Sequence, residues 1–355
     1  MTHPALHTAA CDLFGVRYPI VQTGMGWVAG ARLTSSTSAA GGLGILASAT
    51  MTFEQLADAV HEVQGRTDRP FGVNLRADQD DIDRRIELLI RERVRVASFA
   101  QAPGERIVKQ LRDAGVVTMP TVGAPRHAEK VAAWGVDAVI AQGAEGGGHT
   151  GTIPTSLLLP QVVDAVDVPV LAAGGFTDGR GLTAALAWGA AGVAMGTRFL
   201  LTKESTVPDT VKDVYLGTPV TGTVVTKRID GYPQRVIRTE VVDHLEHSGR
   251  LTALPRALRN ALGFRKLTGT SLRALLREGR AMKRKEGLTW SQVAMAANAP
   301  MLTKATMVDG RLETGILPTG QGVGVIGELP TVAELVARIV DEAAETLTRL
   351  EKGDA

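Results

Sequence analysis

Cysteine is almost absent from the sequence, because Cys11 is the one cysteine among 355 residues. A single thiol cannot build a disulfide framework or a cluster of thiolate metal ligands, and it is usual in the reducing cytoplasm. We therefore expect no metal site. The sequence also lacks an uncharged apolar run near the roughly 20 residues of a membrane span, and its start lacks the basic and apolar regions of a secretion signal. These absences predict a cytoplasmic protein without a membrane segment.

An excess of charge of one sign is also missing, because 39 Lys and Arg stand against 37 Asp and Glu, a net charge of +2. No overall field would draw such a chain to nucleic acid. Apolar residues make up 44% and charged residues 21%, which is the balance of an ordinary globular protein. The length allows one large α/β domain with a modest insertion.

Short apolar runs bounded by turn residues alternate with stretches of helical spacing. The predicted strands are 19–23, 44–48, 71–75, 94–99, 116–122, 137–142, 168–174 and 191–196, and the predicted helices between them are 31–40, 53–65, 81–92, 104–114, 126–134, 156–165 and 179–189. Such alternation forces parallel pairing of the strands. Eight parallel strands favour a closed (β/α)8 barrel, with an open doubly wound sheet as the alternative.

The helix that would complete the barrel comes late in the chain. An amphipathic pattern follows Pro330, and Thr331 with Glu334 has the spacing of a helix-capping box. The sequence therefore predicts a barrel made of 1–205 and 311–355, interrupted after the eighth strand by a smaller, mostly helical domain at 206–310.

Ligands of such barrels collect where the strands end, so the strand ends give a list of candidate residues. The last two strands end in AAGGF and AMGTRF, with glycine turns at Gly174-Gly175 and Gly196-Thr197. Glycine lets backbone N–H groups come close to an anion. Each pair alone could serve only a turn, but two such turns on adjacent final strands favour a phosphate site.

The sixth strand runs into AEGGGHTG, in which three glycines precede His149. A loop of this kind can lie against a flat ring. His149 can act as a general acid or base near neutral pH, or stabilise an oxyanion. A lone histidine is more often structural, but its position at the end of a barrel strand favours a functional role.

Residues 250–286 hold eleven Lys or Arg against two Glu. This segment is either a solvated helix face or a site for a polyanion such as the phosphates of CoA or of a dinucleotide. Nucleic acid is disfavoured, because few aromatic side chains are present for base stacking. The candidate phosphate-binding cations are Arg273, Arg277, Arg280 and Lys283.

Five segments together resemble the 2-nitropropane dioxygenase-like family of FMN barrels, which includes nitronate monooxygenases and flavin-dependent enoyl-thioester reductases. They are PIVQTGMGWVAGARLTSSTSAAGGLGIL (19–46), PFGVN (70–74), GVDAVIAQGAEGGGHTG (135–151), PVLAAGGFTDGRGLTAALAWGAAGVAMGTRFL (169–200) and TGQGVGVIGELPTVAELVARIVDEA (319–343). The resemblance covers nearly the whole chain.

The resemblance implies that FMN lies over the barrel mouth and that His149 is the active-site histidine. The residues that match the family's flavin contacts are Gly24, Met25, Asn74, Gln142, Gly174, Gly175, Gly196 and Thr197. After the fifth strand this chain has GAPRH at 123–127, which departs from the family's usual turn, so that contact does not carry over. Dimerisation is a further family-level expectation.

Within the family, the opening QTGMGWVAGARL, the glycine loop and LTWSQVAMAANAPML (288–302) resemble the actinobacterial flavin oxidoreductases of steroid ring C/D degradation. This implies a bicyclic, indane-type acyl-CoA substrate of steroid or cholesterol catabolism, with a C=C bond introduced or reduced. NADH or NADPH would exchange electrons with the flavin. The alternatives are a nitronate monooxygenase, which oxidises alkyl nitronates with oxygen, and a non-catalytic flavin-binding protein.

Overall fold

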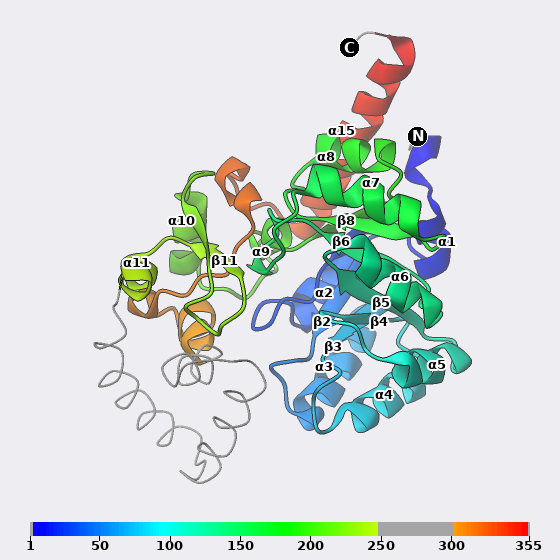
Figure 1. The fold of residues 1–355 in the computed structure, drawn as a ribbon, viewed down its shortest axis with the longest axis horizontal. Coiled ribbons are helices and arrows are strands. Elements are labelled where there is room, and N and C mark those ends of the chain that lie inside the picture. The colour runs from blue at the N-terminus through cyan, green and yellow to red at the C-terminus, as the bar shows by residue number, and fades with distance from the viewer. Residues whose placement is uncertain (1–2, 248–300, 354–355) are drawn as a thin grey trace.

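The computed structural model describes residues 3–247 and 301–353 and contains a closed parallel barrel (Figure 1). Its eight strands lie in the order β1-β2-β3-β4-β5-β6-β8-β9. Their bounds are β1 Ile20–Gln22, β2 Leu43–Ala47, β3 Phe71–Leu75, β4 Val96–Phe99, β5 Val117–Val122, β6 Val139–Gln142, β8 Val170–Ala173 and β9 Gly192–Met195. All eight coincide with the predicted strands.

The barrel closes between its first and last strands. β1 pairs with β2 on one side and with β9 on the other, where Ile20 faces Val193 and Gln22 faces Met195. Nearly every residue in these strands is buried, because side chains fill the barrel interior on one face and meet helices on the other. Closure confirms the (β/α)8 prediction over the open sheet.

Helices follow the strands as an outer layer. They are α2 Ala31–Ala39, α3 Phe53–Arg66, α4 Ile82–Arg91, α5 Glu105–Asp113, α6 Pro125–Ala133, α7 Thr155–Ala165 and α8 Gly179–Ala187, preceded by η1 Pro4–Leu6 and α1 Ala9–Phe14. Apolar residues on one face of each helix, such as Leu56, Val60 and Val63 of α3, pack onto the sheet. All seven predicted connecting helices are present.

The last helix, α15 Val332–Lys352, completes the outer layer. It begins at the predicted capping box, in which Thr331 accepts from the Glu334 backbone and Glu334 accepts in return. It packs against α8 and α2, and Glu342 accepts a 2.9 Å hydrogen bond from the backbone N–H of Gly179 at the start of α8. The chain therefore returns to the barrel after the insertion, as the sequence predicted.

The described part of the insertion is a mixed structure beside the barrel (Figure 1). It holds α10 Asp209–Leu216, β10 Thr223–Thr226, β11 Gln234–Ile237, α11 Glu240–His247 and a helical stretch at 301–307. The short helix α9 Thr197–Leu200 precedes the insertion, and η2 Leu312–Thr314 and η3 Gln321–Val325 follow it. β10 and β11 form an antiparallel hairpin, and β7 Gly148–His149 joins β11 as a third strand. The sequence analysis expected mostly helix here and missed this sheet, while 248–300 lies outside the described residues.

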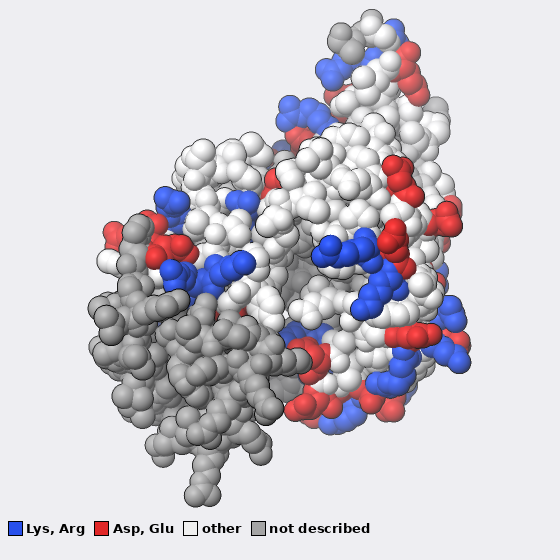
Figure 2. All heavy atoms as spheres, in the orientation of Figure 1, with Lys and Arg blue, Asp and Glu red and all other residues white. Residues whose placement is uncertain are grey.

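On the face drawn in Figure 2, Lys and Arg side chains alternate with Asp and Glu around the described surface. No helix among the described residues combines the length and the apolar character needed to cross a bilayer. Within the same ranges, no group of three His, Cys, Asp or Glu side chains could hold a metal ion.

Candidate active site

The predicted cofactor residues lie at the rim where the parallel strands end, because each follows or ends a barrel strand. Close contacts show that they come together there. A Cβ atom placed on Gly24 would lie 2.4 Å from Cβ of Asn74, so only glycine allows the β1 turn to pack on β3. Met25 lies against Gly196 across the closure of the barrel, with 3.4 Å between its Sδ and a Cβ placed there.

Asn74 is held by the neighbouring strand ends. Its Nδ2 donates to Oγ of Ser98 at 3.2 Å, and its backbone oxygen accepts from Oγ of Ser48 at 2.7 Å. Both partners are buried residues at the ends of β4 and β2. The carboxamide therefore has a fixed orientation at the rim, which suits a residue that orients a ring.

The turn after β8 has a backbone conformation that favours glycine. Gly174 has φ +104° and Gly175 φ +85°, values that L side chains rarely adopt. The β8–β9 register directs the amide of Gly174 toward the sheet ladder, but the amide N–H of Gly175 donates no hydrogen bond to the described residues. The same is true of the amides of Gly196 and Thr197 after the paired strand β9, where α9 begins. These free donors on adjacent turns fit a phosphate group.

Residues 320–328, where the chain returns from the insertion to the barrel (the return segment), contact these turns. The sequence analysis did not derive this contact from the residues. The backbone N–H of Gly320 donates to Oγ1 of Thr197 at 2.8 Å, and that of Gln321 donates to the backbone oxygen of Glu145 at 2.9 Å. A Cβ on Gly147 would lie 2.5 Å from the Gly320 nitrogen. The glycine loop and residues 320–321 are thus pressed together, which explains the need for glycine at 147.

The glycine loop is anchored at both ends. Glu145 accepts from the backbone N–H and Oγ1 of Thr155 at 3.0 and 2.6 Å, and so caps the first turn of α7. Nε2 of Gln142 donates to the backbone oxygen of His149 at 2.7 Å. The guanidinium of Arg235, on β11, donates to the backbone oxygen of Ala144 at 3.0 Å. Barrel and hairpin together fix the path of the loop.

His149 lies on β7, opposite Gln234 of β11. Its side chain is 64% exposed, whereas that of its partner Asp230 is only 16% exposed. Nε2 of His149 lies 2.8 Å from Oδ2 of Asp230, and the Tyr232 ring meets the imidazole edge to face with centroids 5.9 Å apart. The imidazole is thus accessible to a ligand while one of its nitrogens is held.

Asp230 is ionised in this arrangement. Burial raises the pKa of its carboxyl, but hydrogen bonds and charge from His149, together with the Tyr232 backbone N–H and the Gln234 side chain, outweigh burial and lower the pKa below its usual value. The sequence analysis missed Asp230, Tyr232 and Gln234. A signal was present, since Asp230-Gly231 lies between two runs rich in β-branched residues, which is typical of a hairpin.

A cleft of about 290 Å³ lies beside the glycine turns after β8 and β9, between the β8–α8 connection and α15. Arg198 lines it and is 5% exposed. Its Nη2 donates to the backbone oxygens of Leu201 and Glu328 at 2.8 and 3.1 Å. Burial lowers the pKa of Arg198 to about 10. Arg198 therefore ties the return segment to the end of β9.

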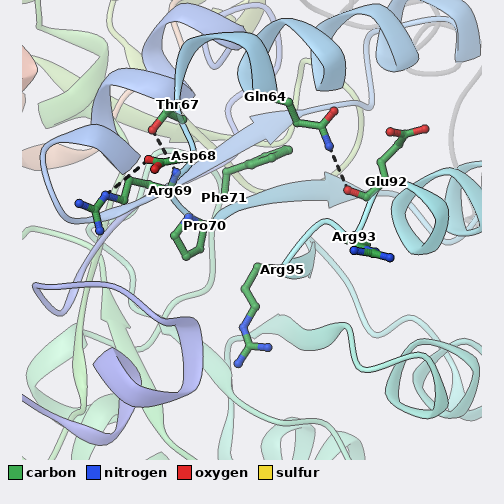
Figure 3. Close-up of a pocket in the computed structure, with 9 residues that line it drawn as sticks. All are labelled: Gln64, Thr67, Asp68, Arg69, Pro70, Phe71, Glu92, Arg93 and Arg95. Carbon is green, nitrogen blue, oxygen red and sulfur yellow. Dashed lines mark hydrogen bonds and ion pairs between the residues drawn. The ribbon is translucent and has the colours of Figure 1, made fainter.

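A larger cleft, of about 500 Å³, lies at the opposite rim, where the strands begin (Figure 3). Its lining includes Thr67, Pro70 and Phe71 before and in β3, and Arg93 and Arg95 before β4. None of the predicted site residues lines it. Enzymes of this fold place their chemistry at the carboxyl ends of the strands, so cleft size does not identify the active site here.

The four predicted CoA-binding cations, Arg273, Arg277, Arg280 and Lys283, lie outside the described residues. The proposed contact with CoA therefore stays a prediction. Among the described residues, the structure gathers His149 and the glycine turns after β8 and β9 on one rim of the barrel and adds the partly buried carboxylate of Asp230 to them.

Comparison with known proteins places the chain in a family. The family model described as nitronate monooxygenase matches residues 7–84 and 80–342. A protein of Mycobacterium tuberculosis (strain ATCC 25618 / H37Rv) is 57% identical over 353 residues, covering 99% of each chain, and one of Rhodococcus jostii (strain RHA1) is 56% identical over 345 residues, covering 97% of this chain and 98% of that protein. Both are named (3aS,4S,5R,7aS)-5-hydroxy-7a-methyl-1-oxo-octahydro-1H-indene-4-carboxyl-CoA dehydrogenase.

Among solved structures, FabK from Thermotoga maritima matches with a TM-score of 0.79 and 33% identity. The match covers 98% of this chain and 99% of the FabK chain. The likeness therefore extends beyond the barrel to the whole architecture.

Proposed function

We propose, from the premise that this chain belongs to the nitronate monooxygenase family of flavin-dependent oxidoreductases, that it uses FMN and NAD(H) to introduce or reduce a C=C bond in an acyl-CoA thioester. The acyl group is a bicyclic, indane-type intermediate of steroid ring C/D degradation. The names of the two relatives at 56% and 57% identity support this substrate class.

The observation that best supports this type of reaction is the position of His149 beside the glycine turns after β8 and β9. The hydrogen on the carbon next to a thioester carbonyl is acidic, so a nearby imidazole can take it as a proton or return it. The hydrogen on the following carbon then leaves, or arrives, as a hydride. Bound FMN would supply that hydride exchange, and NAD(H) would restore its oxidation state.

The residues at the rim are suited to hold FMN. The amides of Gly175, Gly196 and Thr197, which donate to no described residue, would bind its phosphate together with the turn at Gly174. The Gly24-Met25 turn, Asn74 and Gln142 would contact the rest of the cofactor. Support comes from the tight packing of Gly24 on Asn74 and from the hydrogen bond that holds the Asn74 carboxamide, which together fix the position of these residues at the rim.

The test is anaerobic turnover of a bicyclic acyl-CoA of the kind named for the relatives, in the presence of NAD+. We expect a product that has lost two hydrogens, seen by mass spectrometry, and one NADH per product. NAD+ replaced by NADP+ decides the nicotinamide preference. Absence of the oxidised product and of its reverse reaction with NADH would overturn the proposal.

Nitronate monooxygenation is the second candidate, and the matching family model favours it. In that case oxygen-dependent turnover of an alkyl nitronate would proceed without NAD(H). Rapid turnover of this kind, together with inactivity toward the acyl-CoA, would select this candidate. A protein that binds FMN but reacts with neither substrate would be a non-catalytic flavin protein.

A further inference from the structure

Both the backbone and the side chain of His149 are held by neighbouring residues. Its backbone oxygen accepts from Gln142 of the barrel, and its backbone pairs with Gln234 of the hairpin. Its Nε2 lies 2.8 Å from Oδ2 of Asp230, which comes from the loop between β10 and β11. The two residues are 81 positions apart in the chain, so only the fold brings them together. The insertion therefore reaches the candidate catalytic residue directly.

The contact decides which imidazole nitrogen carries the proton. An ionised carboxylate only accepts hydrogen bonds, so Nε2 of His149 must be the donor. Nε2 of Gln234 also lies 3.1 Å from this nitrogen, but an amide nitrogen is itself a donor and cannot pair with a protonated Nε2. Gln234 instead donates to Oδ2 of Asp230, the same carboxylate oxygen. Neutral His149 then has its lone pair on Nδ1.

Nδ1 is free to act. It makes no hydrogen bond with the described residues, and its side chain is 64% exposed. Other ionisable groups near the loop include Tyr232 on the hairpin, Arg235, which binds the Ala144 backbone, and Glu145, which caps α7. Lys227 and Arg228 lie in the same connection as Asp230. Asp230 is the carboxylate that contacts the imidazole.

We infer that Asp230 is a positioning residue that fixes the His149 tautomer, so that Nδ1 takes the proton from the carbon beside the thioester carbonyl. This rests on the proposed function. As that C–H bond breaks, its electron pair forms the C=C bond, and bound FMN would accept the hydride that the next carbon loses. The resulting imidazolium keeps its Nε2–H bond to Oδ2, and the carboxylate stabilises the positive charge. The reverse reaction returns the proton from Nδ1.

The first test is the tautomer itself. In protein labelled with ¹⁵N-histidine, correlation of ring nitrogens with ring protons distinguishes the two neutral forms, and the His149→Ala variant assigns the signal. We expect wild-type His149 to be protonated on Nε2. A wild-type protein with neutral His149 protonated on Nδ1 would overturn the inference, whatever any variant does.

The second test uses the Asp230→Asn variant. The amide can donate to Nε2, which favours the opposite tautomer, so we expect the His149 spectrum to change and kcat to fall by about 10²-fold or more. KM for the acyl-CoA should change little, since Asp230 does not need to touch the substrate. Asp309→Asn, an exposed surface replacement, should leave both unchanged. Unaltered kcat together with an unaltered His149 spectrum in Asp230→Asn would refute the inference.

The two proposals can fail separately. Wild-type protein that turns over no acyl-CoA would overturn the proposed function and the proton transfer assigned to Nδ1. The ¹⁵N spectrum would still show whether Asp230 sets the tautomer. If turnover is present but Asp230→Asn changes only KM, the proposed function stands and the positioning role is wrong.

Discussion

The barrel strands and the insertion hairpin contribute to the candidate site in different ways. All residues of β4, β8 and β9 are buried, and these strands lead into the rim turns that suit a flavin. In β10 only Thr226 is buried, yet the loop after it carries Asp230. The proposed cofactor turns thus rest on fully buried strands, whereas the proposed acid–base pair depends on a half-exposed sheet. Binding and catalysis should therefore respond separately to mutation.

Removal of the imidazole should give the largest effect and would sharpen this separation. For His149→Ala we expect kcat for the acyl-CoA to fall by about 10²- to 10⁴-fold, the range of general acid–base catalysis. Because the side chain is 64% exposed, flavin content should stay near wild type. Steady-state kinetics and the flavin-to-protein absorbance ratio check this. A kcat near that of wild type would remove His149 from the chemistry.

A substitution in the turn after β8 should instead weaken the binding of the flavin. Alanine at Gly175, where φ is +85°, is strained by about 1–2 kcal/mol, and relief of that strain would turn the adjacent amides away from the phosphate. We expect the flavin Kd to rise by about 5- to 30-fold. Gly123→Ala is the matched control, because Gly123 lies at the end of β5 with open space around its Cβ position. Flavin titration of both apoproteins measures the difference, and equal affinities would contradict the phosphate assignment.

The basic part of the insertion should affect substrate binding alone. Double replacement of Arg273→Glu and Arg277→Glu should raise KM for the acyl-CoA by about tenfold, equivalent to about 1.4 kcal/mol of lost binding. Reduction of the flavin by NADH should not change. The control is Lys109→Glu with Lys130→Glu, a charge reversal on barrel helices. If both double variants behave alike, the cluster is a solvated face.

The smallest effect concerns the pH dependence of stability. The pKa of Asp230 is lower in the folded protein than in the unfolded chain, where an aspartate titrates near about 3.9. Its stabilisation is therefore present above about pH 4 and is lost as the pH falls through the folded-state pKa. Asp230→Asn should be less stable than wild type at pH 7, and the gap should close toward pH 3. Urea unfolding at both pH values tests this, and a gap that does not depend on pH would mean that ionised Asp230 adds no stability.

The barrel was predictable because each strand is a short apolar run between turn residues and each helix has its own apolar face. These are local signals, and the capping box at Thr331 and Glu334 is of the same kind. The strand ends then located the rim, so the positions of Gly174, Gly175 and His149 followed from the fold. In a parallel barrel the carboxyl ends of all strands lie at the same rim.

The hairpin and its carboxylate were not predictable in the same way. A helical interpretation of the insertion hid the strands β10 and β11, although Asp230-Gly231 carried a turn signal. The pairing of β7 with β11 joins residues more than eighty positions apart, and no spacing rule encodes such a contact. The packing of Gly147 against Gly320 is equally non-local. Local patterns therefore predicted the frame, and tertiary contacts completed the site.

Anaerobic stopped-flow absorbance of the flavin tests the central claim most directly, when the purified protein is mixed separately with NADH, a bicyclic acyl-CoA and an alkyl nitronate. We expect rapid bleaching by NADH or by the acyl-CoA, as required of an enzyme that moves hydride between the two. Bleaching by the nitronate alone would contradict the account and identify the protein as a nitronate monooxygenase.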